Sequence, residues 1–307
     1  MSRYVLMRLG QGIVALLLST IVVFFLGRLT GNPLDVMLPE TATRESYEIM
    51  AKYLGLDKPL PEQYLIFITR AVSGDLGESL FFRRPVIEMI LRRFPATIIL
   101  AGSAALISLL ISVPAGVVAA VKRGRWQDIT AKAFAIIGQS MPSFWLGILL
   151  IQIFAVGLGW LPAAGYGGLK TLILPAIALG YHATAGILRL TRSSMLDILR
   201  SDFVRLGRIK GLSERSVIWS HALRNALIPV VTFSGVLYVH FLTGSVITET
   251  IFAWPGIGRL AYQAVVNRDF PLVQGLLLIF VGLYVVFNLV IDISYVYLDP
   301  RIRYVKE

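Results

Sequence analysis

The sequence of 307 residues contains no cysteine and little charge. The lack of cysteine excludes disulfides, thiol nucleophiles and cysteine-ligated metals, although it says nothing about the redox compartment. Only 15% of the residues are charged and 56% are hydrophobic, whereas a typical soluble domain has roughly 25% charged residues. The apolar residues form long runs between short charged segments. We therefore expect lipid to face most of the surface.

Sequence motifs for catalysis are also missing. The string 165–171, Gly-Tyr-Gly-Gly-Leu-Lys-Thr, lacks the Gly-Lys pair of a nucleotide-phosphate loop and leads into an apolar run. Neither H-E-x-x-H nor G-x-S-x-G occurs. The three histidines, His182, His221 and His240, fall in different segments, which argues against a metal site. We predict that the chain is not an enzyme, does not hydrolyse ATP itself and binds no cofactor.

The net charge of +11 is compatible with nucleic-acid binding. In a membrane protein, however, Lys and Arg gather in cytoplasmic loops, which is the simpler explanation. We predict no nucleic-acid partner and expect membrane lipids instead.

Six apolar segments reach the roughly 20 residues that a helix needs to cross a bilayer. They predict an all-α integral membrane protein with spans near 9–29, 95–121, 133–158, 171–191, 226–248 and 273–297. The fourth is the weakest, because His182 and several Gly and Ala residues dilute it. The first is too long for a signal peptide and is not followed by a small-x-small cleavage site, so we interpret it as a retained span.

Basic residues predict the orientation. They concentrate before the first span, between the second and third, between the fourth and fifth, and in the tail, whereas the two short opposite loops hold only Lys170, Arg259 and Arg268. The positive-inside rule then predicts that both termini lie in the cytoplasm. The membrane that we expect the chain to cross is the inner membrane of the cell. Along the sequence we predict a first segment with its span at 1–29, a periplasmic insert at 30–94, a five-span core at 95–298 and a cytoplasmic tail at 299–307.

The loop at 192–224 is too long for a bare linker. Residues 203–210 are predicted to form a short helix that Gly211 ends, and Ser213 can cap a second one. Interleaved basic and apolar positions suit a docking element for a cytoplasmic protein. An amphipathic helix on anionic headgroups is the alternative.

Polar residues inside spans are candidates for a pathway. His182, His240 and Asn288 lie there, although interhelical hydrogen bonds would also explain them. Mid-span carboxylates, which proton- or Na⁺-driven transporters usually have, are missing. No filter-like segment supports a channel.

Many short motifs, in order along the chain, resemble those of one family. They are Gly31-Asn32-Pro33, Leu54-Gly55-Leu56-Asp57-Lys58-Pro59, Gly74-Asp75-Leu76-Gly77-Glu78-Ser79, Ser140-Met141-Pro142-Ser143-Phe144, Lys210-Gly211-Leu212-Ser213-Glu214, His221-Ala222-Leu223-Arg224-Asn225-Ala226 and Trp254-Pro255-Gly256-Ile257-Gly258. The family comprises the membrane permease subunits of binding-protein-dependent ABC importers, in the dipeptide, oligopeptide and nickel branch.

The resemblance implies a type I ABC importer permease fold and a set of partners. A second, similar permease would complete the translocation pathway as a heterodimer. Two cytoplasmic ATPase subunits would bind ATP and Mg²⁺, and a periplasmic or lipid-anchored binding protein would deliver the solute. The loop at 192–224 would be the element that couples the permease to an ATPase.

The resemblance also implies roles for single residues. Gly211 is similar to the glycine at the bend of the coupling motif, which Glu214 follows. Arg205, Arg208 and Lys210 would contact the ATPase, with Leu212 and Val217 as apolar anchors. Glu249 and Trp254 match the last periplasmic loop and are candidates for a gate.

The chain departs from the pattern at 206–207. The branch usually has Thr and Ala there, and this chain has Leu206 and Gly207.

Three functions remain open at this point. The first is a permease for dipeptides or oligopeptides, with nickel or glutathione as alternative substrates. The second is a membrane scaffold, and the third is a proton-coupled transporter.

Overall fold

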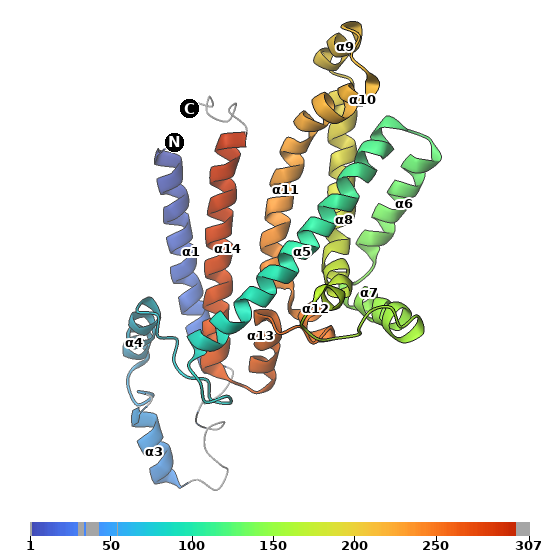
Figure 1. Ribbon diagram of the computed structural model, residues 1–307. Coiled ribbons are helices and arrows are strands. Elements are labelled where there is room, and N and C mark those ends of the chain that lie inside the picture. The colour runs from blue at the N-terminus through green and yellow to red at the C-terminus, as the bar shows by residue number, and fades with distance from the viewer. Residues whose placement is uncertain (1, 30–33, 35–42, 54, 299–307) are drawn as a thin grey trace. The chain divides into compact units, whose positions relative to one another are not determined.

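The computed structural model describes residues 2–29, 34, 43–53 and 55–298 and is helical, with one isolated bridge between Glu78 and Pro85 (Figure 1). The predicted all-α class is confirmed. Gly31-Asn32-Pro33 and the tail at 299–307 lie outside the described residues. Contacts group the chain into two compact units, Met1–Thr97 with Pro255–Leu289 and Ile98–Trp254 with Val290–Glu307. These units are not continuous in sequence. The predicted division into an insert, a core and a tail stays a prediction.

Within the described residues, five helical segments are long and apolar enough to cross a membrane, or six if one bent pair is a single span. The helices in the five are α1 (Ser2–Leu29), α5 (Val86–Val121), α8 (Leu169–Leu199), α11 (Leu223–Gly244) and α14 (Phe270–Leu298). Four of them cover a predicted span, and α11 covers most of the fifth. The predicted fifth span runs too far, because the helix ends at Gly244 and residues 246–248 begin a separate helix, α12 (Val246–Ile251).

The third predicted span is not one straight helix. Helix α6 (Trp126–Ser140) is followed by α7 (Ser143–Leu150) and the π-helix η1 (Ile151–Gly157), and the axis bends by 107° between α6 and the pair α7–η1. Pro142 causes the break, because proline has no N–H and its ring disfavours the α conformation of the preceding residue. Met141 is accordingly extended, with φ −86° and ψ 125°.

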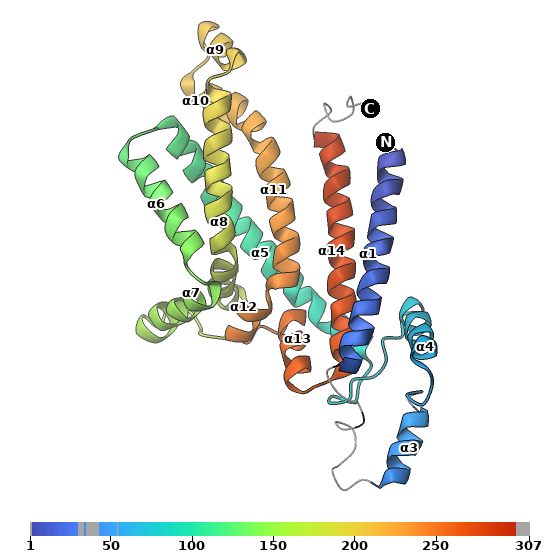
Figure 2. The same cartoon turned by 180° about the vertical axis from the view of Figure 1, so that it is seen from behind.

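In the first unit, α1 and α14 lie side by side, and a Cβ added at Gly12 would meet Val285 at 2.7 Å (Figure 2). Helix α3 (Arg44–Tyr53) precedes α4 (Leu60–Val72), which packs on α1 through a hydrogen bond of 2.8 Å between the hydroxyls of Thr20 and Tyr64. Helix α13 (Ile257–Val266) and the first turns of α5 and α14 share a buried core.

The buried carboxylate of Asp269 links two separate segments of this unit. It accepts hydrogen bonds from the Ser79 hydroxyl and from the backbone N–H groups of Leu80, Phe81 and Leu272. One side chain thereby joins the loop after α4 to the start of α14.

Helix α8 is central in the second unit, where it contacts α6, α7 and α11. It also packs closely on α5: a Cβ at Gly180 would lie 2.6 Å from Ser108 Oγ, and one at Gly116 would lie 2.7 Å from Thr191 Cβ. Ser108 also donates a hydrogen bond of 2.8 Å to the Gly180 carbonyl. This packing explains the weak hydropathy of the span, because 61% of its most apolar window is covered by protein and small residues suit close helix contacts.

Candidate functional site

The loop between α8 and α11 is almost entirely helical. After α8 ends, α9 (Asp202–Ile209) is followed by a turn, by α10 (Glu214–Ser216) and by the π-helical segment η2 (Val217–Ala222), which runs directly into α11. Helix α9 lies beyond the ends of α8 and α11 in both views (Figures 1 and 2). The predicted pair of short helices is confirmed, and the second one is the start of α11's own helical path.

Gly211 makes the turn between the two helices. Its φ is +80°, a left-handed conformation that costs an L-residue with a side chain about 1–2 kcal/mol. Its N–H donates to the Arg208 carbonyl at 3.0 Å, and the Leu212 N–H donates to the Gly207 carbonyl at 3.2 Å. These bonds satisfy carbonyls at the end of α9, as predicted for a helix-ending glycine.

Two polar contacts hold the turn closed. The Arg208 guanidinium donates to both carboxylate oxygens of Glu214, at 2.7 and 3.3 Å. The Ser213 hydroxyl accepts from the Ser216 N–H at 3.3 Å, which confirms the predicted cap. Arg208 and Glu214 therefore stabilise the loop's own shape.

A buried cluster fixes the loop to the membrane helices. Val204 of α9 and Val217 of η2 pack with residues at those ends of α5, α8 and α11 that are predicted to face the cytoplasm. Val217 is only 1% exposed, so its predicted role as an apolar anchor for a partner is wrong. It is hidden because η2 turns that face onto α5 and α8, and its contribution is to hold the loop in place.

The outward face of the loop is both basic and apolar. Arg205, Lys210, Gly211 and Leu212 are exposed, as a contact surface requires. The residue-by-residue prediction missed three large apolar side chains on this face, Phe203, Leu206 and Ile209, of which Ile209 is 73% exposed. The helical spacing of 203, 206 and 209–210 in the sequence was the available signal.

The two residues that depart from the family pattern, at 206 and 207, both fit the structure of the loop without a clash. Leu206 enlarges the exposed apolar surface. A Cβ at Gly207 would lie 3.5 Å from Leu212 Cδ1 and 3.9 Å from Val217 Cγ2, which is ordinary contact. The more usual alanine would therefore fit at 207.

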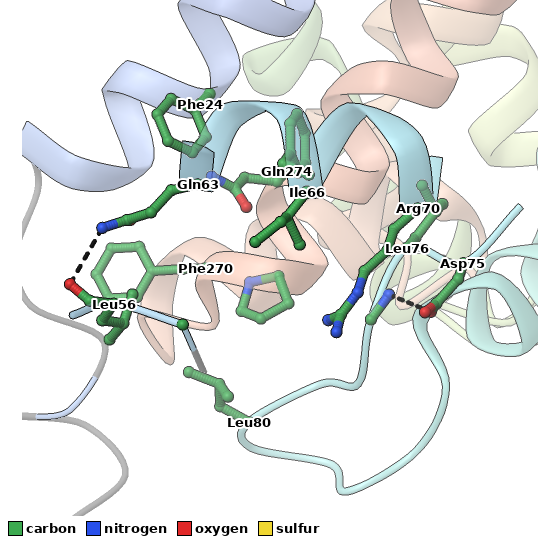
Figure 3. A pocket seen from close by; sticks show the side chains of 14 residues that line it. Phe24, Leu56, Gln63, Ile66, Arg70, Asp75, Leu76, Leu80, Phe270 and Gln274 are labelled. Atoms are coloured by element: carbon green, nitrogen blue, oxygen red, sulfur yellow. Dashed lines mark hydrogen bonds between the residues drawn. The ribbon is translucent and has the colours of Figure 1, made fainter. Parts of the chain in front are cut away.

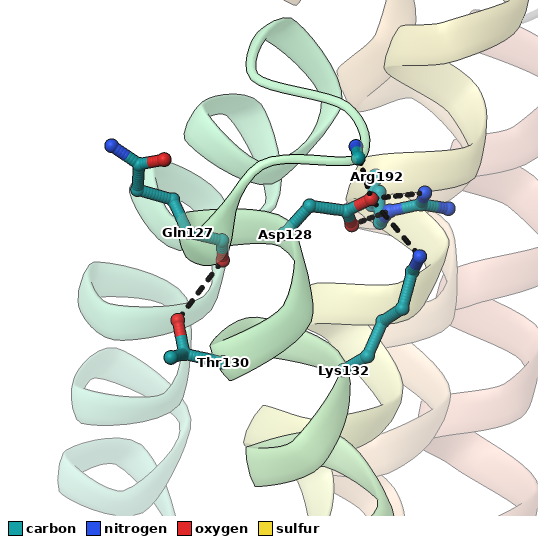
Figure 4. Close-up of polar contacts among 6 residues, drawn as sticks. Gln127, Asp128, Thr130, Lys132 and Arg192 are labelled. Carbon is teal, nitrogen blue, oxygen red and sulfur yellow. Dashed lines mark hydrogen bonds and ion pairs between the residues drawn. The ribbon is translucent and has the colours of Figure 1, made fainter.

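A buried ion cluster lies next to the base of the loop (Figure 4). Asp128 at the start of α6 is fully buried and accepts two hydrogen bonds from Arg192 of α8, at 2.6 and 3.0 Å. It also accepts from the Gly124 N–H at 3.0 Å and pairs with Lys132 at 3.0 Å. Because Arg192 opens the predicted loop, this cluster ties the loop's base to the α5–α6 turn.

Sequence comparison places the whole chain in one family. Residues 112–304 match the family described as "Binding-protein-dependent transport system inner membrane component", and residues 1–101 match its N-terminal family. The chain belongs to this family of ABC importer permeases. Its members are transport components rather than catalytic subunits. Because their transport depends on a binding protein, the match decides against the scaffold and the proton-coupled transporter.

Relatives and solved structures agree with this assignment. The permease is 41% identical over 305 residues to the "Glutathione transport system permease protein GsiC" of Escherichia coli K12, with 99% of this chain and 100% of the relative covered. The protein of that name from Shigella dysenteriae serotype 1 gives the same values.

Two solved structures share the fold. An inward-facing methionine ABC transporter, MetNI, has a TM-score of 0.57 at 19% identity and covers 69% of this chain and 97% of its own. An amino acid ABC transporter crystallised with histidines has a TM-score of 0.55 at 15% identity, covering 68% and 94%. The family match and the relatives, together with the candidate spans, make the permease a multi-pass protein of the inner membrane.

The predicted pathway residues of the permease lie on three helices, two in the second unit and one in the first. His182 of α8 and His240 of α11 are exposed in the single chain. Asn288 of α14 donates to the Tyr284 carbonyl at 2.9 Å, a contact within its own helix. Their role in a pathway stays a prediction.

The predicted gate residues are buried within the permease. Glu249 accepts a hydrogen bond of 2.7 Å from Ser245, and its carbonyl accepts the Trp254 N–H at 2.8 Å. The Trp254 ring packs edge-on against Tyr166, with centroids 4.8 Å apart. These contacts stabilise the segment after α12, and a gating role for Glu249 and Trp254 stays a prediction.

Proposed function

We propose that this permease forms half of the translocation pathway of an ATP-driven importer of short peptides, with glutathione as the first candidate. The observation that carries the proposal is the 41% identity to glutathione permeases across the whole length of both chains. Glutathione is itself a short peptide, so the proposal agrees with the peptide class expected from the sequence motifs.

The assembly that we propose has a second, similar permease beside this chain, as a heterodimer. Two ATPase subunits bind ATP and Mg²⁺ on the cytoplasmic side, and a periplasmic or lipid-anchored binding protein delivers the substrate. Both termini and the loop at 192–224 lie in the cytoplasm, because most basic residues outside the spans fall on that side.

The loop's outward face is the proposed contact with an ATPase. Arg205 and Lys210 supply positive charge, and Phe203, Leu206 and Ile209 supply exposed apolar area. Interfaces combine such an apolar centre with a polar rim. The buried side of the loop is fixed by Val204 and Val217, so a movement of the ATPase would pass to α8 and α11 as a rigid displacement.

Substrate identity is tested by uptake in cells that lack this permease. Labelled glutathione, a dipeptide and Ni²⁺ are offered separately, with and without the restored gene. We expect restored uptake of glutathione and no effect on Ni²⁺. Restored Ni²⁺ uptake alone would refute the peptide proposal.

The docking face is tested by placing a charge on it. Ile209→Asp should abolish co-purification of the ATPase subunits and ATP-driven uptake while membrane insertion is kept. Ile49→Asp is the matched control, because Ile49 is also largely exposed and lies on α3, far along the chain from the loop. ATPase retained by Ile209→Asp would show that the partner binds elsewhere.

A further inference from the structure

An amphipathic cavity of about 180 Å³ opens in the first unit between α1, α4, the loop after α4 and the start of α14. Figure 3 shows Phe24 from α1, Gln63, Ile66 and Arg70 from α4, and Phe270 and Gln274 from α14 around this space. A single water needs about 10–15 Å³ by this kind of measure, so the cavity has room for a much larger group.

One of the residues that line the cavity, Gln63, has a buried acceptor without a partner among the described residues. Gln63 is only 9% exposed, and its Nε2 donates to the carbonyls of Leu56 at 3.1 Å and Lys58 at 2.7 Å. These two bonds fix the orientation of the amide, because only the nitrogen can donate. Oε1 is then directed away from them, and it has no hydrogen-bond partner among the residues that the structure describes. A buried acceptor of this kind calls for a donor from a bound molecule.

The other lining groups define what that molecule carries. Arg70 is exposed at the rim and makes no ion pair with any other described residue, so it offers a guanidinium to a phosphate or carboxylate. Phe24, Ile66 and Phe270 supply an apolar wall. The cavity therefore suits a molecule with a hydrogen-bond donor, an anionic group and an apolar body.

The position of the cavity indicates the source of such a molecule. Phe24 lies about 7.5 Å along the axis from the last residue of α1, at 1.5 Å per residue, and Phe270 is the first residue of α14. Both helices are candidate spans with little of their apolar surface buried, at 17% of each window. The cavity is thus at the level where a membrane span meets the headgroup layer.

We propose that this cavity binds a phospholipid with a primary ammonium headgroup, of the phosphatidylethanolamine type. The ammonium donates to Gln63 Oε1, the phosphate binds Arg70, and the glycerol and first acyl carbons lie against the apolar wall. The lipid thereby holds α4 against the ends of α1 and α14.

The test compares headgroups and variants in the full-length permease purified in mild detergent. Tightly retained lipids are measured by mass spectrometry, and the rise in the thermal unfolding midpoint is followed as each lipid is added. Phosphatidylethanolamine should be retained and stabilising. Phosphatidylcholine has no donor in its headgroup, so it should bind about tenfold more weakly, as expected for one lost hydrogen bond to a charged group. Phosphatidylglycerol can offer only neutral hydroxyl donors, so it should bind less tightly than phosphatidylethanolamine, because hydrogen bonds that involve a charged group are stronger than neutral ones.

Three variants separate the site from general effects of lipid. Arg70→Gln removes the proposed phosphate partner, Ile66→Trp fills the cavity, and both should lose retained phosphatidylethanolamine. Lys52→Gln removes an exposed positive charge outside the cavity and should retain it. If all three headgroups stabilise the protein equally, if only water fills the site, or if a dipeptide displaces the lipid and stabilises the protein instead, the proposal is overturned. Peptide uptake is not part of this measurement. The lipid proposal can therefore fail while the proposed transport function stands.

Discussion

The guanidinium of Arg192 meets the buried carboxylate of Asp128 in two parallel hydrogen bonds, from Nε to Oδ1 at 2.6 Å and from Nη2 to Oδ2 at 3.0 Å. The two residues are 64 positions apart in the sequence. They connect the first turn of α6 with the last part of α8, where the coupling loop begins. Planar, two-point pairs of this kind fix orientation as well as charge.

Breaking this pair should be costly. Arg192→Met leaves the Asp128 charge buried with only Lys132 and the Gly124 N–H, and we expect a loss of about 3–5 kcal/mol in the free energy of unfolding. The thermal unfolding midpoint of the detergent-solubilised permease measures this effect. Glu48→Gln, which removes an exposed pair with Arg44, should change stability by less than about 1 kcal/mol. Equal shifts for the two variants would contradict the assignment.

Close packing of α5 on α8 predicts a glycine requirement. Gly180→Ala would place a Cβ within 2.7 Å of the Ala104 carbonyl oxygen, which belongs to a helix backbone and cannot easily move. We expect a loss of about 1–3 kcal/mol, as for overpacked cores. Gly102→Ala is the control, because its Cβ would meet nothing within 4 Å. The same thermal measurement on both variants distinguishes a local clash from a general intolerance of α5 and α8.

The bend of the coupling loop predicts opposite effects at its two glycines. Gly211→Ala forces a side chain into a left-handed conformation and should cost about 1–2 kcal/mol, with a loss of substrate uptake per ATP hydrolysed. Gly207→Ala lies inside α9 with room for a methyl group and should stabilise the helix by about 0.5–1 kcal/mol. Uptake and ATPase activity of the complete transporter are measured together. Coupling that is unchanged in Gly211→Ala would show that the bend is not needed in this form.

The hydrogen bonds that Asp269 accepts predict that its replacement loosens the loop after α4. Asp269→Asn replaces one carboxylate oxygen with an N–H₂ group that faces backbone donors, so a buried donor loses its acceptor at a cost of about 1–3 kcal/mol. Limited proteolysis should then cleave the segment around Ser79–Phe81 faster. Glu78→Gln changes an exposed carboxylate one residue before this segment and should leave the cleavage rate as it was.

The spans and the loop helices were largely predictable, because apolar runs, Gly211 and Ser213 act through local physics. Pro142 marks in the sequence a place where a helix can break, but the sequence does not reveal how far the chain turns there. The extent of α8 beyond its predicted end was also missed, because a helix covered by protein need not be apolar along its whole length.

Tertiary contacts explain the remaining errors. Val217 is apolar and lies in the loop, which are the features expected of a contact residue. Only the packing of η2 on α5 and α8 shows that it faces inward. Asp128 is the one acidic residue in the basic segment 122–132, which could have marked it. Its partner Arg192 could not be chosen, because several arginines follow in the same stretch and the pairing depends on how α6 packs against α8.

The uninterrupted helical path from α10 through η2 into α11 gives the loop a mechanical advantage. Glu214–Gly244 is 31 residues long, which at 1.5 Å per residue is a rod of about 46 Å. A tilt of about 5° at one end of such a rod moves the other end by about 4 Å. The segment can therefore act as a lever arm, in which a small rotation at the loop becomes a displacement as wide as a side chain at the opposite membrane face.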